Sequence, residues 1–231
     1  MNSPLRKTAR RQSPAPAQAR VIRRALVAWY LKNGRQFPWR RKTASVYRKI
    51  VVEVLLQRTQ AATVAAFFGT FITRFPSWRS LAETPAHEIG EYLKPLGLWK
   101  RRGESLSALA TRMTELNGRF PKERQNIEQL PGVGQYIASA VLLFVHGKSE
   151  PLLDVNMARV LERLFGSRTL VDLRYDAHLQ SISRTIVRGK HSQQLNWAFL
   201  DLAAGICLPR NPKCRICPLR RWCPSADCDE R

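Results

Sequence analysis

The chain has 231 residues, 44% of them hydrophobic, so it can bury the core of one or two small domains. Its 39 Lys and Arg residues outnumber its 17 Asp and Glu residues, which gives a formal net charge of +22 at pH 7. This excess predicts a polyanionic partner such as nucleic acid. No uncharged apolar run reaches the roughly 18–20 residues of a membrane-spanning helix, so a spanning protein is excluded.

The N-terminal segment is basic throughout. Fourteen Lys or Arg residues and no Asp or Glu occur before Glu53, and residues 1–18 are rich in Pro, Ala, Ser and Gln. We interpret residues 1–18 as a disordered basic arm that adds non-specific DNA affinity. A mitochondrial presequence has a similar composition, but early prolines break an amphipathic helix, and no apolar signal segment is visible. We therefore expect a cytoplasmic, nucleoid-associated protein, with organellar targeting as the alternative.

From about Ala19 onward, apolar residues recur at helical spacing and no alternating strand pattern is visible. Asn33-Gly34 and Asn117-Gly118 are typical of helix C-caps, and Thr84-Pro85 is typical of a helix start. About ten short helices with short connections predict an all-α protein.

Four cysteines form the strongest motif, Cys207-x6-Cys214-x2-Cys217-x5-Cys223. Four thiolates within seventeen residues can hold either one tetrahedral zinc ion or an iron–sulfur cluster. Only one CxxC pair is present, whereas zinc sites usually have two, so the spacing favours a cluster. The loop between the first two cysteines carries Arg210 and Lys213, which could contact DNA phosphates. The fifth cysteine, Cys228, is interpreted as a free thiol.

A second motif is Leu130-Pro131-Gly132-Val133-Gly134, followed by Gln135 and an apolar segment. Glycines permit a tight turn, and backbone N–H groups at the start of the next helix can bind an anion. The motif predicts a helix–hairpin–helix that binds a DNA phosphate without reading sequence. The alternative is an ordinary turn between helices.

Two carboxylates stand out by their surroundings. Glu53 is the single polar residue of the segment 50–56, which predicts a carboxylate on a buried helix. Burial raises a carboxyl pKa and suits a general acid, although an ion pair with an arginine such as Arg58 is an equal alternative. Asp154 follows an apolar run and precedes a helix, where it can be an N-cap and can also face a developing cation.

The hairpin, an aspartate about twenty residues later and the cysteine quartet together resemble the helix–hairpin–helix DNA glycosylases, over about residues 20–225. The resemblance implies a [4Fe-4S] cluster on the four cysteines and a DNA cleft between two helical lobes. Residues 43–150 would form a six-helix barrel lobe with the hairpin. Residues 19–42 and 151–231 would form the second lobe, which carries the cluster. A monomer that binds double-stranded DNA with a mismatched or damaged base is expected.

By this resemblance, Asp154 matches the catalytic aspartate and Glu53 matches a glutamate of the base pocket. Tyr136 occupies the position where bifunctional members have a lysine that forms a Schiff base, so base excision without strand cleavage is expected. Gln57 and Leu98 match residues that probe or wedge into the DNA stack beside the extruded nucleotide.

The base is inferred from smaller differences. Tyr136 and the Leu96-Gly97-Leu98 segment resemble the Mig-type enzymes that remove thymine or uracil opposite guanine, and the chain ends eight residues after Cys223. Gln57 and Gln60 resemble MutY-like enzymes, so adenine excision opposite 8-oxoguanine or guanine is the alternative. A non-catalytic iron–sulfur DNA-binding protein is the alternative of another class.

Overall fold

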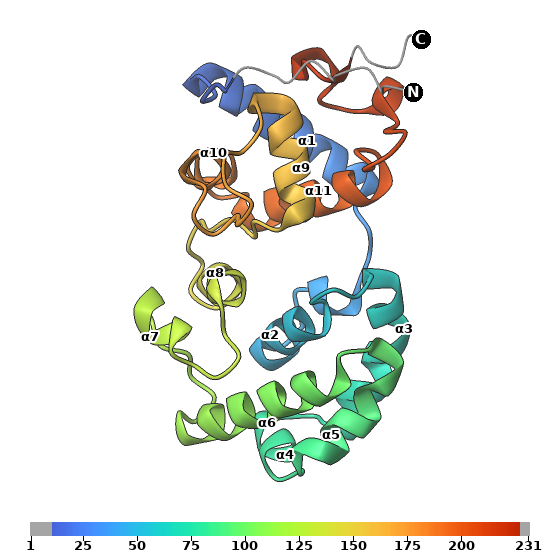
Figure 1. Cartoon of the computed structure of the whole chain (residues 1–231), viewed down its shortest axis with the longest axis vertical. Helices are drawn as coiled ribbons and strands as arrows, with labels where there is room; N and C mark the ends of the chain where they lie inside the picture. The colour runs from blue at the N-terminus through green and yellow to red at the C-terminus, as the bar shows by residue number, and fades with distance from the viewer. Residues whose placement is uncertain (1–10, 227–231) are drawn as a thin grey trace. The chain divides into compact units, whose positions relative to one another are not determined.

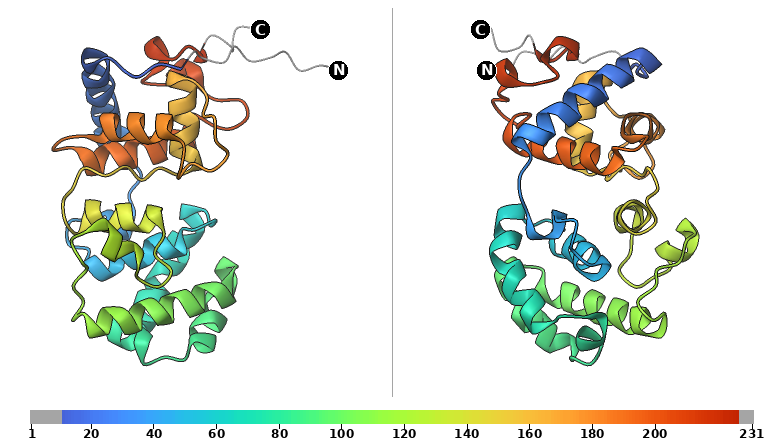
Figure 2. Two further views of the ribbon diagram at one scale, coloured as in Figure 1. Left: turned by 60° about the vertical axis from the view of Figure 1, so that its left-hand side comes forward. Right: turned by 180° about the vertical axis from the view of Figure 1, so that it is seen from behind.

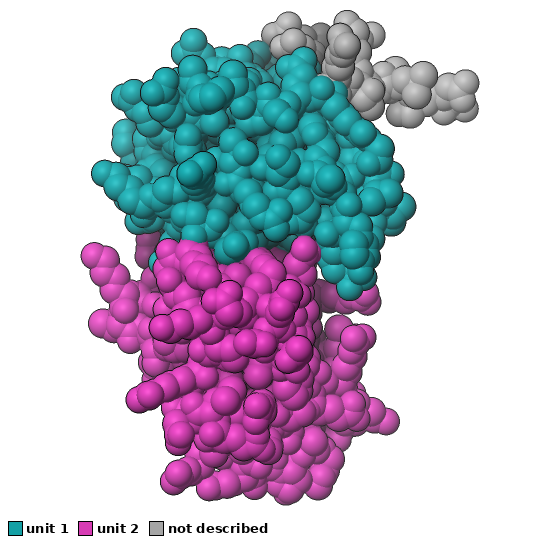
Figure 3. Space-filling model, turned by 90° about the vertical axis from the view of Figure 1, so that its left-hand side faces the viewer, with its two compact units in different colours: residues 1–35, 149–231 teal, residues 36–148 magenta. Residues whose placement is uncertain are grey.

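The computed structural model describes residues 11–226 and assigns to them eleven α-helices, four short 3-10 helices and no β-strand (Figure 1). The expectation of an all-α protein is confirmed. The chain divides into two compact units, coloured separately in Figure 3: unit 1 comprises residues 1–35 and 149–231, and unit 2 comprises residues 36–148. None of the described helices is both long and apolar enough to cross a membrane.

Unit 1 begins with α1 (Pro16–Asn33), which starts three residues before the helix expected from Ala19. Pro16 suits the first helical turn because its fixed φ matches the helix and its missing N–H has no partner there. Just before α1, Arg11 Nε donates to the carbonyl of Ser167 at 2.9 Å and the N–H of Gln12 donates to that of Phe165 at 2.9 Å. Residues 11–18 of the expected disordered arm are therefore ordered, while residues 1–10 lie outside the described part.

Three further long helices complete unit 1: α9 (Val155–Phe165), α10 (Ala177–Val187) and α11 (Ser192–Gly205), seen from two other sides in Figure 2. α1 packs on α10 and α11, and α9 packs on the same two helices. Their shared core is apolar and buried, and it includes Ile22, Leu26, Leu161, Phe165 and Phe199. The N-terminal helix thus completes a core whose other helices come from the C-terminal third of the chain.

Helix α11 also fixes the two chain segments at which unit 1 ends. Asp201 accepts hydrogen bonds from the backbone N–H of Arg35 at 2.8 Å and from its Nε at 2.7 Å. Asn196 accepts from the N–H of Leu152 at 2.6 Å and donates to the carbonyl of Glu150 at 3.0 Å. Both α11 side chains are buried. Their hydrogen bonds therefore hold the backbone near residues 35 and 150 against α11.

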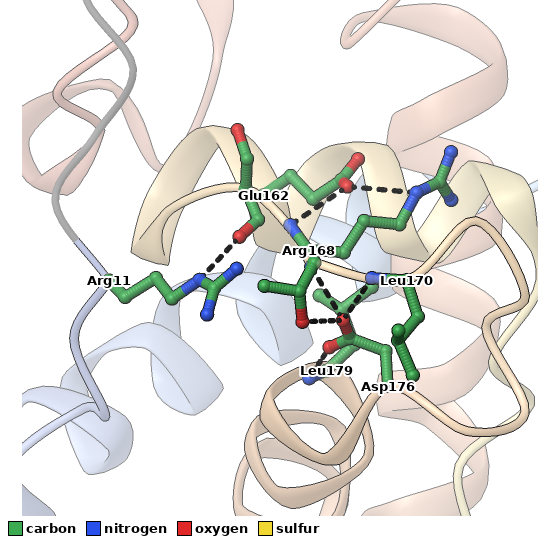
Figure 4. Close-up of polar contacts among 8 residues, drawn as sticks. Arg11, Glu162, Arg168, Leu170, Asp176 and Leu179 are labelled. Carbon is green, nitrogen blue, oxygen red and sulfur yellow. Dashed lines mark hydrogen bonds and ion pairs between the residues drawn. The ribbon is translucent and has the colours of Figure 1, made fainter.

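The connection between α9 and α10 is ordered by one carboxylate, Asp176 (Figure 4). This fully buried side chain accepts hydrogen bonds from the N–H groups of Thr169, Leu170 and Leu179 at 2.7, 3.1 and 2.9 Å. Burial alone would raise the pKa of Asp176, but these donors outweigh burial and lower the pKa to about 2. The loop between α9 and α10 is therefore held in place by a carboxylate that stays ionised at neutral pH.

Unit 2 consists of helices between residues 38 and 144. They are η1 (Pro38–Arg40), α2 (Val46–Leu55), α3 (Ala61–Arg74), α4 (Trp78–Ala82), α5 (Ala86–Leu93), η2 (Lys94–Leu96), α6 (Trp99–Glu115), α7 (Arg124–Glu128) and α8 (Gln135–Phe144). α2 packs against α3, α6 and α8, and α6 packs against α4 and α5. Ser45 caps α2 by accepting from the N–H of Arg48 at 3.3 Å. α2 is thus the central helix of unit 2, consistent with its nearly all-apolar sequence.

Candidate functional site

The predicted hairpin lies between α7 and α8 in unit 2. Gly132 has φ of 71°, the left-handed region that favours glycine, and a Cβ there would lie 3.0 Å from Ser105 Cβ. Gly134 is the N-cap of α8 and has extended backbone; a Cβ there would meet no described heavy atom within 4 Å. Leu130 and Val133 are buried beneath the turn. Gly132 therefore shapes the turn, and open space lies beside Gly134 at the N-terminus of α8.

Glu53 and Tyr136 come from two helices of unit 2 that pack together, α2 and α8. Glu53 is only 5% exposed, as the apolar sequence around it predicted, and Val52 and Val54 beside it are also buried. Tyr136 is the second residue of α8, directly after the hairpin, and is partly buried. The fold thus brings the helices that carry these two residues into contact.

Gln57 and Leu98 lie on two loops of unit 2. Gln57 is exposed just after α2, and Leu98 is 49% exposed just before α6. Leu98 has a left-handed backbone with φ of 50°, which is uncommon for a residue other than glycine. Arg102, which sequence reasoning did not select, hydrogen-bonds to both of these loops.

Asp154 lies in unit 1 and is the N-cap of α9, as expected. Its Oδ1 accepts from the N–H groups of Asn156 and Met157 at 3.0 and 2.8 Å, and its Oδ2 accepts from Asn156 Nδ2 at 2.7 Å. Burial raises the pKa of Asp154, and these hydrogen bonds and the charge of Arg159 oppose that rise. The carboxylate therefore has a fixed orientation at the positive end of a helix, where negative charge is stabilised.

The four predicted cysteine ligands lie together in unit 1. Cys207, Cys214, Cys217 and Cys223 all line one pocket beside the core, and none is in a disulfide. Burial raises the pKa values of the Cys217 and Cys223 thiols to about 11. Within residues 11–226, no three His, Cys, Asp or Glu side chains form a group arranged to hold a metal ion. Four sulfurs around one pocket are nevertheless the donor set that an iron–sulfur cluster requires.

Positive charge surrounds the cysteine pocket. Arg163 Nη1 donates to Cys207 Sγ at 3.1 Å and to the carbonyl of Leu208 at 2.8 Å. Arg210 and Lys213, between the first two cysteines, are exposed as a phosphate contact would require. Cys228 lies outside the described residues. The candidate residues thus fall into two sets: Asp154 and the cysteine loop in unit 1, and the hairpin, Glu53 and the two probing loops in unit 2.

Comparisons with known proteins identify the family to which the chain is similar. The family model of the HhH-GPD superfamily base excision DNA repair proteins matches residues 51–184. The thymine-DNA glycosylase of Aeropyrum pernix is 38% identical over 208 residues, which cover 88% of this chain and 93% of that protein. The adenine DNA glycosylase of Buchnera aphidicola subsp. Baizongia pistaciae is 33% identical over 89% of this chain, but the match covers 58% of that protein.

Among solved structures, a thermostable thymine-DNA glycosylase superposes with a TM-score of 0.82 at 31% sequence identity. The superposition covers 90% of this chain and 96% of that chain. The likeness therefore extends over both units, including the segments before and after the family match.

Proposed function

The chain belongs to the HhH-GPD superfamily of base excision DNA repair proteins, and we propose that it is a monofunctional DNA glycosylase that removes thymine or uracil opposite guanine. The observation that carries this proposal is the fixed orientation of the Asp154 carboxylate. A partly buried carboxylate, fixed by three hydrogen bonds at the start of α9, is suited to stabilise a positive charge on a sugar.

The proposed reaction is hydrolysis of the N-glycosidic bond. The bond between the base nitrogen and C1′ breaks, and the base leaves with the electron pair and takes up a proton. The sugar becomes oxocarbenium-like, the ionised Asp154 stabilises it, and water adds its oxygen to C1′ and loses a proton. We assign Glu53 and Tyr136 to the extruded base, which Glu53 would contact from α2 and Tyr136 from the first turn of α8.

Two features support the choice of base and reaction. Tyr136 stands where a Schiff-base lysine would be needed for strand cleavage, so the proposed enzyme leaves an abasic site intact. A pocket for thymine also admits uracil, because uracil lacks only the 5-methyl group and a missing methyl group costs only about 10- to 200-fold in discrimination. The extent of the thymine-DNA glycosylase match, 93% of that protein, supports pyrimidine over adenine excision.

We further propose that the four cysteines hold a [4Fe-4S] cluster and that the chain binds double-stranded DNA as a monomer. When bound, the cluster would supply rigid cross-links within residues 207–223. Arg210 and Lys213 would then contact phosphates from a fixed loop, and the hairpin N–H groups near Gly134 would contact another phosphate. A brown protein with about four irons per chain supports this proposal, and stoichiometric zinc without iron contradicts it.

The decisive experiment is an excision panel on labelled duplexes containing T·G, U·G, A opposite 8-oxoguanine, A·G and oxidised pyrimidines, each followed by alkali. We expect cleavage after alkali at T·G and U·G only. Cleavage confined to the adenine substrates identifies the adenine glycosylase instead. Cleavage of no substrate by a protein that still binds these duplexes identifies a non-catalytic DNA-binding protein.

Asp154→Asn is the matched variant, because asparagine is as good an N-cap as aspartate but carries no charge. We expect it to abolish excision while DNA affinity and the melting temperature stay close to wild type. Borohydride with the wild type should trap no covalent DNA adduct; a strong trapped band would contradict the monofunctional assignment.

A further inference from the structure

Arg102 connects the two loops of unit 2 that carry Gln57 and Leu98. Its side chain is buried in the first turn of α6, with the residue 3% exposed. Nη1 donates to the carbonyls of Leu96 and Gly97, both at 2.8 Å. Nη2 donates to the carbonyl of Gln57 and to the hydroxyl of Thr59 on the same loop. One guanidinium therefore holds the backbone beside both candidate probing residues.

A threonine hydroxyl closes the connection. Thr59 Oγ1 accepts from Arg102 Nη2 at 2.7 Å and donates to the carbonyl of Leu96 at 3.2 Å. The two loops are about 40 residues apart in the chain, and they are tied both directly and through Arg102. Each loop also contains a left-handed residue other than glycine, Arg58 with φ of 56° and Leu98 with φ of 50°. Such backbone conformations persist where surrounding contacts hold them.

The surroundings of the Arg102 guanidinium compensate its buried charge only in part. The acceptors of the Arg102 guanidinium are carbonyl and hydroxyl oxygens rather than a carboxylate, and its Nε has no hydrogen-bond partner in the described chain. Burial lowers the pKa of Arg102, which shows that its charge is disfavoured there. The N-terminal turn of a helix also disfavours a cation. A buried apolar side chain would often be at least as stabilising, so a role beyond stability is favoured.

We propose that Arg102 is a positioning residue that fixes the Gln57 and Leu98 loops relative to each other, so that both side chains enter the DNA stack together beside the target nucleotide. The inference rests on the proposed glycosylase function. Unstacking a base costs free energy, and loops that are already ordered lose less conformational entropy on insertion. Arg102 would therefore affect base extrusion, and it would not affect cleavage of the glycosidic bond.

The test compares two substrates in single-turnover excision at saturating enzyme: uracil paired with guanine in a duplex, and uracil unpaired in a one-nucleotide bulge. We expect Arg102→Lys to slow excision from the U·G duplex by about tenfold or more, and from the bulge by less than about threefold. An equal loss on both substrates would overturn the inference, because a purely structural defect slows both. Arg112→Lys, a surface position on the same helix, should slow neither.

Two further measurements keep the inference testable if Arg102→Lys folds poorly. Thr59→Val removes the bridging hydroxyl at similar size and should show the same duplex-selective loss. In a background that carries both Gln57→Ala and Leu98→Ala, Arg102→Lys should add less than about twofold on the U·G duplex, because its effect passes through these two side chains. Independent, multiplied losses would contradict the positioning role.

Fluorescence separates this inference from the proposed function. A 2-aminopurine beside the target uracil should brighten when the wild type unstacks the duplex and should brighten much less with Arg102→Lys. Equal brightening with both proteins overturns the positioning role even if excision is observed. A wild type that excises no base contradicts the proposed function, whereas the difference in brightening can still be measured.

Discussion

Arg159 reaches from α9 to Cys207, whose carbonyl oxygen accepts a hydrogen bond from Arg159 Nε at 2.8 Å. The same guanidinium donates from Nη1 to Asn156 Oδ1 at 3.2 Å, and Asn156 Nδ2 donates to Asp154 Oδ2 at 2.7 Å. A continuous set of hydrogen bonds therefore joins the proposed catalytic carboxylate to the first cysteine of the quartet. We therefore expect a change in the conformation of the cysteine loop to alter the contacts of Asp154.

The first prediction concerns the pH dependence of excision in Arg159→Met. The positive charge of Arg159 lowers the pKa of Asp154, against the effect of burial, so its removal raises that pKa further. In the proposed reaction, excision needs the ionised Asp154 carboxylate and fails as the pH falls through the pKa of that group. The acid limb of the single-turnover rate should therefore move to higher pH in the variant.

Arg163→Met is the matched control for this prediction. Arg163 contacts the same loop, through Cys207 Sγ and the carbonyl of Leu208, but it makes no hydrogen bond to Asn156 or Asp154. The acid limb of the single-turnover rate of Arg163→Met should stay at the wild-type pH even if the overall rate falls. A shift of equal size in both variants would show that loop disorder, and not the charge of Arg159, controls Asp154.

The second prediction concerns stability and Asp176. Its pKa in the folded protein is about 2, below the ordinary value near 4, so its ionisation stabilises the fold above pH 4 and this contribution is lost as the pH falls toward 2. Asp176→Asn should lower the free energy of unfolding by about 2 kcal/mol at pH 7. Urea denaturation should show this difference shrinking between pH 4 and pH 2.

Asp172→Asn provides the comparison within the same loop. Asp172 pairs with Arg174 at 2.6 Å, but both side chains are largely exposed, at 41% and 62%. Solvent screens an exposed ion pair, so this variant should be close to wild type. Comparable destabilisation by both substitutions would indicate that net charge, and not the buried hydrogen bonds of Asp176, stabilises the loop.

Helical periodicity and capping residues made most of the fold predictable, but the reasons were not always those expected. Gly34 was interpreted as a helix C-cap, and α1 does end at Asn33. The φ of Gly34 is −63°, however, so a left-handed conformation is not the reason why glycine is found there. A Cβ at Gly34 would lie 2.6 Å from the Tyr30 carbonyl oxygen, so glycine is needed for close packing. This contact lies within the last turn of α1 and depends on the extended conformation in which the chain leaves the helix, which the Asn33-Gly34 pair does not specify.

The candidate site also contains one residue that could be predicted from the sequence and one that could not. Asp154 was predictable because an aspartate before a helix is a local signal, and its observed role as an N-cap follows directly. Arg102 was not predictable, because its partners are mostly backbone carbonyls on segments about 5 and 45 residues away. Any residue type supplies a carbonyl, so no sequence pattern marks these partners. Arg102 also lies in a run of basic residues that looks like a solvated helix face.

The third prediction concerns the cysteine loop. Cys207→Ser should lose most bound iron and the associated broad absorption, because one of the four proposed ligands is replaced. Since Cys207, Cys217 and Cys223 pack against the core of unit 1, the loss should also speed amide hydrogen exchange in residues 207–223. Cys228→Ser is the matched control and should keep its iron. Equal iron in both variants would exclude Cys207 as a ligand.

The fourth prediction concerns Tyr136, which by the proposed function stands where a bifunctional enzyme would have a lysine. Tyr136→Lys places an amine at the second residue of α8, in a partly buried position. Partial burial and the positive end of the helix both favour the neutral amine, which is the nucleophilic form. The variant should therefore form a Schiff base with the abasic sugar, visible as a protein–DNA band after borohydride. Tyr136→Phe, which adds no amine, should give none. A band with Tyr136→Phe or with the wild type would mean that another lysine of this chain reaches the sugar, and the monofunctional assignment would then be wrong.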